Sequence, residues 1–147
     1  MFDQQLYRIN DRALIRVEGP DALKFLQNLV TNDLNIVAPK LIYSALLSPQ
    51  GKYLFDFFIL RETVSSFLID ISSRPEESFL DRLKMYKLNS NVTFKKIVGN
   101  VGIGFYEKPK HAFFDPRCER LGWRIYFAQK DLPELSQSDF DKIRVQF

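Results

Sequence analysis

Cysteine and histidine are almost absent from this 147-residue chain, which holds one of each, Cys118 and His111. A single cysteine excludes a disulfide within the chain and any metal or cluster site built from several of its cysteines. One histidine leaves too little for a histidine-based catalytic triad or a histidine-rich metal site. We therefore expect neither a metal site nor catalytic residues of these kinds.

Targeting segments and long apolar runs are missing as well. The start Met1-Phe2-Asp3 lacks the basic region and apolar run of a signal peptide, and no apolar run reaches the roughly 20 residues that cross a bilayer. The net charge is +3, with acidic and basic residues interspersed rather than gathered in a basic tail. We expect a cytoplasmic protein, or one of the mitochondrial matrix if the source is eukaryotic, with neither membranes nor nucleic acids as partners.

Aromatic side chains are abundant, with 14 Phe and 6 Tyr, which is typical of a large core or an aromatic-lined pocket. The proportions of hydrophobic (46%) and charged (27%) residues are those of a soluble globular protein. At this length a chain forms one domain that buries roughly 68–70% of its unfolded surface. The sequence therefore predicts a single domain over residues 1–147.

The strongest local pattern is a hairpin over residues 41–61. Two apolar stretches flank Ser48-Pro49-Gln50-Gly51, where proline suits the second position of a type I turn and glycine the fourth. Strand side chains alternate between faces, so the second strand should present two sets of residues. The first set is Tyr53, Phe55, Phe57 and Ile59, and the second is Leu54, Asp56, Phe58 and Leu60. We expect both faces to be covered, with Phe55 and Phe57 buried.

Asp56 is unusual because burying a carboxylate in an apolar row costs free energy unless a partner satisfies it. Asp70 repeats this pattern in the next predicted strand, 66–71. From the strand context alone, either a structural ion pair or a bound ligand explains Asp56. Because neighbouring strands bring same-face side chains together, we expect Tyr43, Asp56 and Asp70 to border a common concavity.

The remaining elements are two helices and several short strands. One helix is predicted near 20–30, opened by Gly19-Pro20-Asp21, and another near 74–88, opened by the capping box Ser73-Arg74-Pro75-Glu76. Short strands are predicted in 6–17, in a hairpin over 92–106 around Gly99-Asn100, and at 112–114 and 123–127. A polar linker, 132–137, leads to a last helix starting at Ser138. This order favours an α+β domain with a largely antiparallel sheet and two main helices.

Four motifs occur in a characteristic order along the chain. They are Gly19-Pro20-Asp21-Ala22 leading to Phe25-Leu26-Gln27-Asn28, Thr31-Asn32-Asp33-Leu34, Leu47-Ser48-Pro49-Gln50-Gly51-Lys52, and Asp115-Pro116-Arg117 with Leu121-Gly122-Trp123-Arg124. The set resembles the folate-binding YgfZ family, which is related to the glycine-cleavage T-protein (aminomethyltransferase). The last motif is most similar to the iron–sulfur maturation branch of that family.

The resemblance implies the fold of the aminomethyltransferase folate-binding domain, tetrahydrofolate as cofactor, and a role in assembling or repairing iron–sulfur proteins. By this likeness the folate-contacting carboxylate is Asp56, where the T-protein has two adjacent aspartates and this chain has Phe55-Asp56. A pocket tyrosine falls on or near Tyr43, and a pocket asparagine falls near Asp70. Asn32 is expected to end the first helix and shape the pocket floor.

Three functions remain open from the sequence. The first is a folate-binding accessory protein of iron–sulfur assembly, the second a folate-dependent aminomethyltransferase, and the third a non-catalytic interaction domain. Arg117 and Arg124 are expected either to bind the acidic tail of a folate or to brace local loops.

Relatives continue into a region with a lysine-glycine-cysteine peptide that this chain lacks, so we expect the N-terminal part of a longer, truncated family member. Without the missing part, which would close the folate pocket, we expect the chain to expose an apolar patch around Phe140, Ile143 and Phe147. It would then bind folate weakly or form homo-oligomers through that patch.

Overall fold

The computed structural model describes residues 6–35, 40–105, 107–128 and 132–135, together with Ser138 and Lys142. The chain divides into two compact units, one formed by Ala13–Ile97 and the other by Met1–Arg12 with Val98–Phe147. That residues 1–147 act as one domain stays a prediction.

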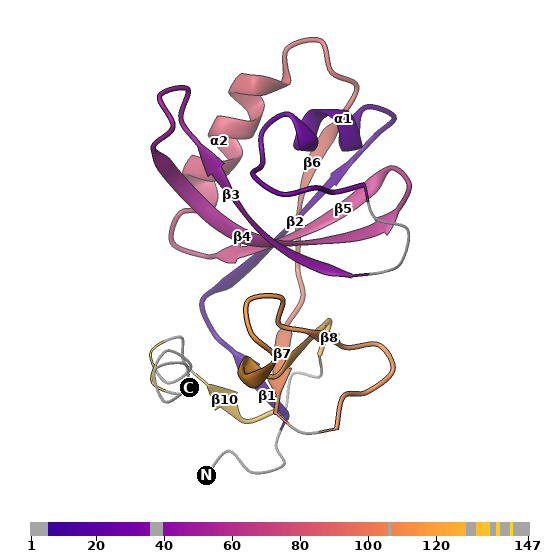
Figure 1. Cartoon of the computed structure of the whole chain (residues 1–147), viewed down its shortest axis with the longest axis vertical. Coiled ribbons are helices and arrows are strands. Elements are labelled where there is room, and N and C mark those ends of the chain that lie inside the picture. Colours follow the sequence, from indigo (N-terminus) through magenta and orange to yellow (C-terminus); the bar gives the residue numbers. More distant parts are fainter. Residues whose placement is uncertain are drawn as a thin grey trace. The chain divides into compact units, whose positions relative to one another are not determined.

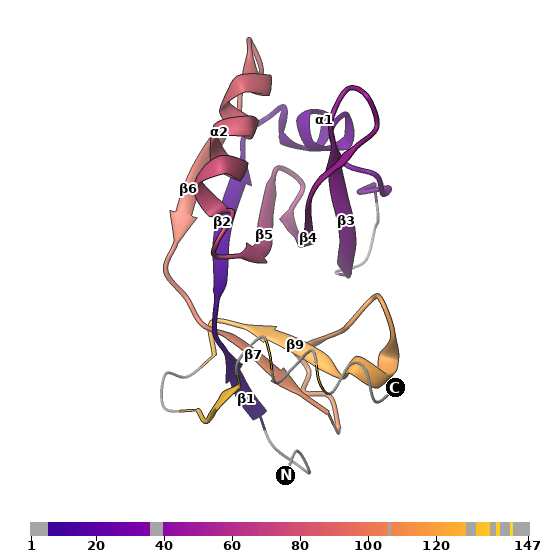
Figure 2. The same cartoon turned by 90° about the vertical axis from the view of Figure 1, so that its left-hand side faces the viewer.

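The unit Ala13–Ile97 is built on a five-stranded sheet with the order β3-β4-β5-β2-β6. Figure 1 shows the helices α1 and α2 beside this sheet. Both helices share one hydrophobic core with its strands. The pairs β3–β4, β4–β5 and β2–β6 are antiparallel, and β2 and β6 lie side by side in both views (Figure 2). The bounds are β2 Arg12–Glu18, α1 Ala22–Gln27, β3 Leu41–Leu47, β4 Tyr53–Thr63, β5 Ser66–Ser72, α2 Glu76–Lys87 and β6 Thr93–Ile97.

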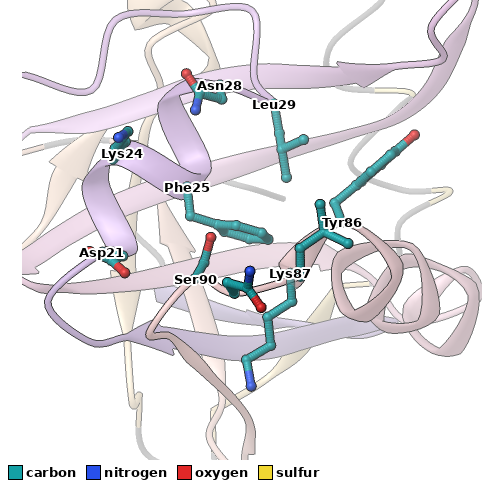
Figure 3. Close-up of a pocket in the computed structure, with 10 residues that line it drawn as sticks. Asp21, Lys24, Phe25, Asn28, Leu29, Tyr86, Lys87 and Ser90 are labelled. Atoms are coloured by element: carbon teal, nitrogen blue, oxygen red, sulfur yellow. The ribbon is translucent and has the colours of Figure 1, made fainter.

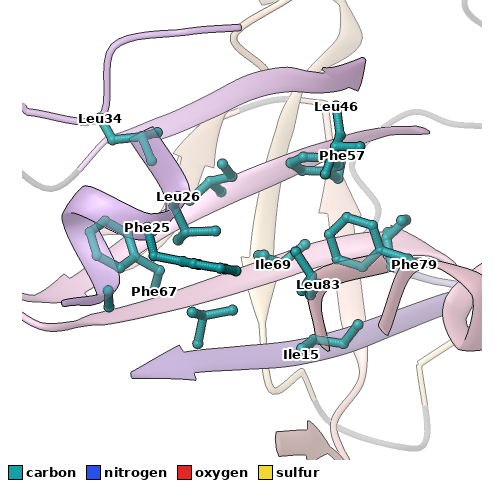
Figure 4. Packing of buried hydrophobic residues seen from close by; sticks show 14 of the residues in the cluster. Ile15, Phe25, Leu26, Leu34, Leu46, Phe57, Phe67, Ile69, Phe79 and Leu83 are labelled. Carbon is teal, nitrogen blue, oxygen red and sulfur yellow. The ribbon is translucent and has the colours of Figure 1, made fainter. Parts of the chain in front are cut away.

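The core of this unit fills the space between the helices and one face of the sheet. Figure 4 shows Phe79 and Leu83 of α2 among strand residues that include Ile15, Phe57 and Ile69. The Phe79 ring lies 5.1 Å from the ring of Phe57 and meets the ring of Phe55 edge-on at 5.3 Å. Phe57 is buried as predicted, but Phe55 is only half-buried, because it lies near the end of β4 where the sheet is less covered.

The predicted hairpin over 41–61 is confirmed. Its turn is closed by the Gly51 N–H, which donates to the Ser48 carbonyl oxygen at 2.9 Å. Gly51 has φ +84°, a conformation that glycine adopts without the clash a side chain would cause. The turn chemistry of the sequence therefore set the register of the two strands.

One irregularity in the hairpin was not predicted. Leu46 pairs with Phe55 and Leu47 with Tyr53, so Leu54 is an extra residue on β4 and forms a β-bulge. A bulge reverses the facing of the residues beyond it. The predicted faces of Tyr53 and Leu54 are therefore wrong: Tyr53 joins the face of Asp56, and Leu54 packs against the helix-side core.

The second unit contains a smaller sheet with the order β10-β1-β7-β9-β8. The β1–β7, β7–β9 and β8–β9 pairs are antiparallel, whereas β10 runs parallel to β1. The bounds are β1 Leu6–Ile9, β7 Val101–Gly104, β8 Phe113–Phe114, a short 3-10 helix Glu119–Leu121, β9 Trp123–Tyr126 and β10 Glu134–Leu135. The predicted α+β class is confirmed, with two mainly antiparallel sheets in place of one.

The predicted hairpin over 92–106 is wrong, although both of its strands exist. β6 pairs with β2, whereas β7 pairs with β1 and β9 in the other sheet. Asn100 is held by a different neighbour, because its carbonyl oxygen accepts the Ala128 N–H at 3.1 Å. Its side-chain amide donates in turn to the Ala128 carbonyl oxygen at 3.3 Å. The Gly99-Asn100 segment therefore joins two sheets instead of turning back within one.

Both main helices lie within their predicted ranges. The expectation that Asn32 ends the first helix is wrong, because α1 ends at Gln27 with Asn28 as its C-cap. The second helix, α2, begins without the predicted capping box. Its N-cap is Pro75, which offers no side-chain hydrogen bond. The Glu76 N–H donates instead to the backbone carbonyl oxygen of Ser73 at 3.2 Å. A backbone turn has therefore taken the place of the side-chain cap.

Two C-terminal predictions have different outcomes. The predicted linker 132–137 contains β10, which is paired to β1 and tied by the Arg8–Glu134 ion pair. The expected patch at Phe140, Ile143 and Phe147 lies outside the described residues. Within the described part of the chain, no helix is long and apolar enough to cross a membrane.

We predict that Phe79→Ala lowers the free energy of unfolding by about 3–5 kcal/mol, because it removes a fully buried ring and leaves a cavity. The matched control is Met85→Ala on the same helix, whose side chain is 56% exposed and whose loss should change stability by less than about 0.5 kcal/mol. Urea unfolding of both variants measures the difference. Equal effects would contradict this packing.

Candidate functional site

Three of the predicted site residues share the sheet face that is turned away from the core around Phe79. Phe58 pairs with Tyr43 on β3 and with Asp70 on β5. Directly paired residues share a face, and so do residues two apart on a strand. Tyr43, Asp56 and Asp70 therefore lie on one face, as the strand pattern predicts. We call Tyr43, Tyr53, Asp56 and Asp70 the acidic face.

The centre of the acidic face is a hydrogen bond between two neighbouring strands. The Tyr43 hydroxyl donates to Oδ2 of Asp56. The two side chains are diagonal neighbours, since Asp56 pairs with Ala45. The Tyr43 ring also packs against Phe58, with ring centroids 5.2 Å apart and a tilt of 57°. An aromatic platform and a carboxylate are thereby held side by side.

Asn32 supports Tyr43 through the backbone. Its side-chain Nδ2 donates to the Tyr43 carbonyl oxygen at 3.1 Å. Next to it, the Thr31 hydroxyl lies 3.2 Å from that of Ser44 and accepts the Ala45 N–H at 3.1 Å. The segment after α1 is thus fastened along β3. Asn32 positions the strand that carries Tyr43 and makes no described contact with Asp56 itself.

Tyr53 belongs to the acidic face and was missed from the sequence. The bulge turns it to the side of Asp56. Tyr53 is exposed, yet a partial loss of water contact, and then the nearby Asp56 carboxylate, raise the pKa of its phenol. A regular strand pattern puts Tyr53 on the face of the sheet opposite to that of Asp56. No residue of the turn or of the strand marks the bulge.

The two carboxylates of the acidic face differ in exposure. Asp70 is 1% exposed, whereas Asp56 is half-buried. A ligand from solution therefore reaches Asp56 more readily than Asp70. Asp56 can accept a hydrogen bond from a ring N–H or an amine, because an ionised carboxylate is an acceptor with several lone-pair sites.

A cavity of about 490 Å³ lies elsewhere in this unit, between α1 and the end of α2 (Figure 3). It is lined by Asp21, Lys24, Phe25, Asn28, Leu29, Tyr86, Lys87, Leu88, Asn89 and Ser90. None of the four site residues predicted from the sequence lines this cavity, neither Asn32 nor Tyr43, Asp56 or Asp70. The common concavity expected around Tyr43, Asp56 and Asp70 stays a prediction.

The Asp-Pro-Arg motif forms a closed loop in the second unit. Asp115 accepts three hydrogen bonds from Arg117, from its backbone N–H and Nε at 2.9 Å each and from Nη2 at 2.7 Å. Gly122 follows at φ +84°, where an added Cβ would lie 2.1 Å from the Gly104 carbonyl oxygen. Arg117 therefore braces its own loop, which is one of the two roles expected for it. Arg124 is 2% exposed on β9.

Cys118 is an exposed free thiol at the edge of this loop. Among the residues that the structure describes, no three histidine, cysteine, aspartate or glutamate side chains are grouped so that they could hold a metal ion.

The bulge predicts a coupling between Tyr53 and Asp56. The pKa of Tyr53 is higher in the folded chain than in the unfolded chain, so the protonated phenol stabilises the fold. This contribution to the free energy of unfolding is present below about pH 10 and is lost as the pH rises through the raised pKa. Asp56→Asn should lower the Tyr53 pKa part of the way, since burial, the larger cause, remains.

Ring NMR signals of Tyr53, assigned with Tyr53→Phe, measure this pKa. Asp81→Asn, at an exposed position of α2, is the matched control and should leave it unchanged. A Tyr53 pKa that stays the same in Asp56→Asn would show that the two side chains are not neighbours.

Comparison with known proteins agrees with the fold and the motifs. The family model described as "GCVT N-terminal domain" matches residues 5–103. The mitochondrial iron-sulfur cluster assembly factor IBA57 of Mus musculus is 30% identical over 159 aligned residues, covering 88% of this chain and 44% of the mouse protein. The mitochondrial IBA57 homolog of Mycosarcoma maydis is 33% identical over 101 residues, covering 60% of this chain and 25% of that protein.

Among solved structures, the glycine cleavage system aminomethyltransferase T from Bartonella henselae aligns with a TM-score of 0.61 and 21% identity. The alignment covers 66% of this chain and 27% of the enzyme, and it shows a shared fold. The chain spans less than half the length of the curated relatives named above. Because the family model covers most of the sequence, the resemblance predicted from the motifs is confirmed: the chain belongs to the GCVT N-terminal domain family.

Proposed function

We propose that this chain is a tetrahydrofolate-binding accessory module of iron–sulfur cluster assembly, without turnover of its own. The observation that carries the proposal is the Tyr43–Asp56 hydrogen bond on the acidic face. It presents a half-buried carboxylate beside an aromatic ring.

The residues present suit a folate in their chemistry. Tetrahydrofolate brings a flat heterocycle with N–H donors, and Asp56 would accept from such a donor. Tyr43 offers aromatic surface of the kind that lines ligand pockets, backed by the buried ring of Phe58. Tyr53 adds a phenol beside the same carboxylate. Asn32 would act indirectly, by holding the backbone of Tyr43.

The assembly role rests on the relatives. The proteins named above from Mus musculus and Mycosarcoma maydis are called iron-sulfur cluster assembly factors of mitochondria. Since the chain matches less than half of each, its partners are part of the proposal: folate, and proteins that assemble iron–sulfur clusters. The compartment would be the mitochondrial matrix in a eukaryote and the cytoplasm in a bacterium.

An aminomethyltransferase is the second candidate, favoured by the fold shared with the Bartonella henselae enzyme. Position 55 argues against it. Where the T-protein has a pair of aspartates, this chain has Phe55, and its ring packs on Phe79 at the helix-side core. The described strand β4 therefore offers one carboxylate, Asp56, at this point.

We predict that Asp56→Asn weakens tetrahydrofolate binding by about 10- to 100-fold, because a hydrogen bond to a charged group contributes roughly 1.5–3 kcal/mol. Tyr43→Phe should weaken it by about fivefold, since it removes a hydrogen bond that orients Asp56 while the carboxylate that meets the ligand remains. Isothermal titration calorimetry measures both variants, and Asp81→Asn on α2 serves as the matched control.

Binding that is equally strong in Asp56→Asn and Asp81→Asn would contradict the assignment of Asp56. No measurable binding in the wild-type chain would favour the third function, an interaction domain without a folate.

We further predict no one-carbon transfer by this chain. Incubated with tetrahydrofolate and an aminomethyl-loaded carrier protein of the glycine cleavage system, it should form methylenetetrahydrofolate no faster than the uncatalysed mixture. A dehydrogenase-coupled absorbance assay follows the product, with an authentic aminomethyltransferase as positive control. Turnover that is lost in Asp56→Asn would instead support the enzyme.

A further inference from the structure

We propose that the cavity between α1 and the end of α2 is a second binding site, which takes a small organic anion with an apolar body. Its position separates it from the acidic face. The cavity is lined by residues of the two helices and the loop after α2, and both helices pack on the opposite side of the sheet from Asp56. The proposal is therefore independent of folate binding.

The charges at the cavity favour an anion. Asp21 is its one lining carboxylate, and this group is already engaged, because its Oδ2 accepts the Asn91 N–H at 2.7 Å. Lys24 and Lys87 also line the cavity. Neither lysine forms a salt bridge within the described ranges of the chain. The lining therefore carries two ammonium groups against one carboxylate, a net positive charge that attracts an anion.

The inner surface suits an apolar body. The Phe25 ring is directed into the space between α1 and the loop that holds Ser90, with Leu29 and Tyr86 beside it (Figure 3). Phe25 is 5% exposed and packs from behind on Phe94, with ring centroids 5.6 Å apart, so the floor is fixed before a ligand arrives. The volume of about 490 Å³ lies within the range of roughly 300–1,000 Å³ typical of ligand pockets.

Leu88 supplies a separate observation. It follows α2 with φ 48° and ψ −120°, a conformation that strains any residue with a side chain, and it is 86% exposed. Glycine, which has no side chain to clash, is the residue that adopts such a positive φ without strain. The folded chain gains almost no burial from this leucine, whereas a ligand in the cavity would cover it. Strained residues of this kind concentrate where ligands are held.

Anilinonaphthalene sulfonate, an aromatic anion, is a suitable probe, and N-phenylnaphthylamine is its uncharged counterpart. We expect the anion to bind the whole chain and to shift the backbone NMR signals of Phe25 and of 88–90. The double variant Lys24→Ala/Lys87→Ala should bind the anionic probe about tenfold more weakly, as expected for the loss of two exposed ion pairs. Its affinity for the neutral probe should stay the same. Lys95→Ala, an exposed lysine on β6, is the matched control and should change neither affinity.

Leu88→Gly gives a second test with opposite effects on two readouts. This substitution should raise the melting temperature, because glycine relieves the backbone strain. It should also weaken the binding of both probes, because their apolar contact with the leucine is lost. Three results would overturn the proposal: no binding of the anion, equal affinity in the lysine double variant and Lys95→Ala, or signal shifts confined to the acidic face. None of these results bears on tetrahydrofolate binding, which has its own variant at Asp56.

Discussion

The hydrogen bond that satisfies the Asp56 carboxylate is the interaction on which the acidic face depends. Asp56 lies on β4, and the phenol of Tyr43 on the neighbouring strand donates to it. The β-bulge at Leu54 then brings Tyr53 to the same carboxylate. A buried or half-buried charge is costly unless such donors surround it. A set of donors around one acceptor is also what a ligand site needs.

The two faces of the five-stranded sheet are accordingly specialised. One is covered by α1 and α2 through a continuous aromatic and aliphatic core that includes Phe57 and Phe79. The other carries the acidic face. Leu54 links the two, because the bulge that turns Tyr53 toward Asp56 also turns Leu54 into the core. A local irregularity thus improves packing and site chemistry together.

The sequence predicts what local chemistry determines. The turn at 48–51 fixes the hairpin, and the period-2 pattern correctly puts Tyr43, Asp56 and Asp70 on one face. It does not predict what depends on distant partners. β6 and β7 were expected to pair, yet each has a partner from the N-terminal strands instead. The bulge at Leu54 leaves no mark in the residue pattern, so Tyr53 was assigned to the wrong face.

The most direct test of the central claim is an NMR titration of the isotope-labelled chain with tetrahydrofolate. The account predicts that the largest signal changes fall on the acidic face, at Tyr43, Tyr53 and Asp56, and that they disappear in Asp56→Asn. It also predicts that any signal change at the α1–α2 cavity, such as at Phe25, is smaller and is the same in Asp56→Asn. Saturable changes centred on that cavity, or on neither surface, would contradict the account.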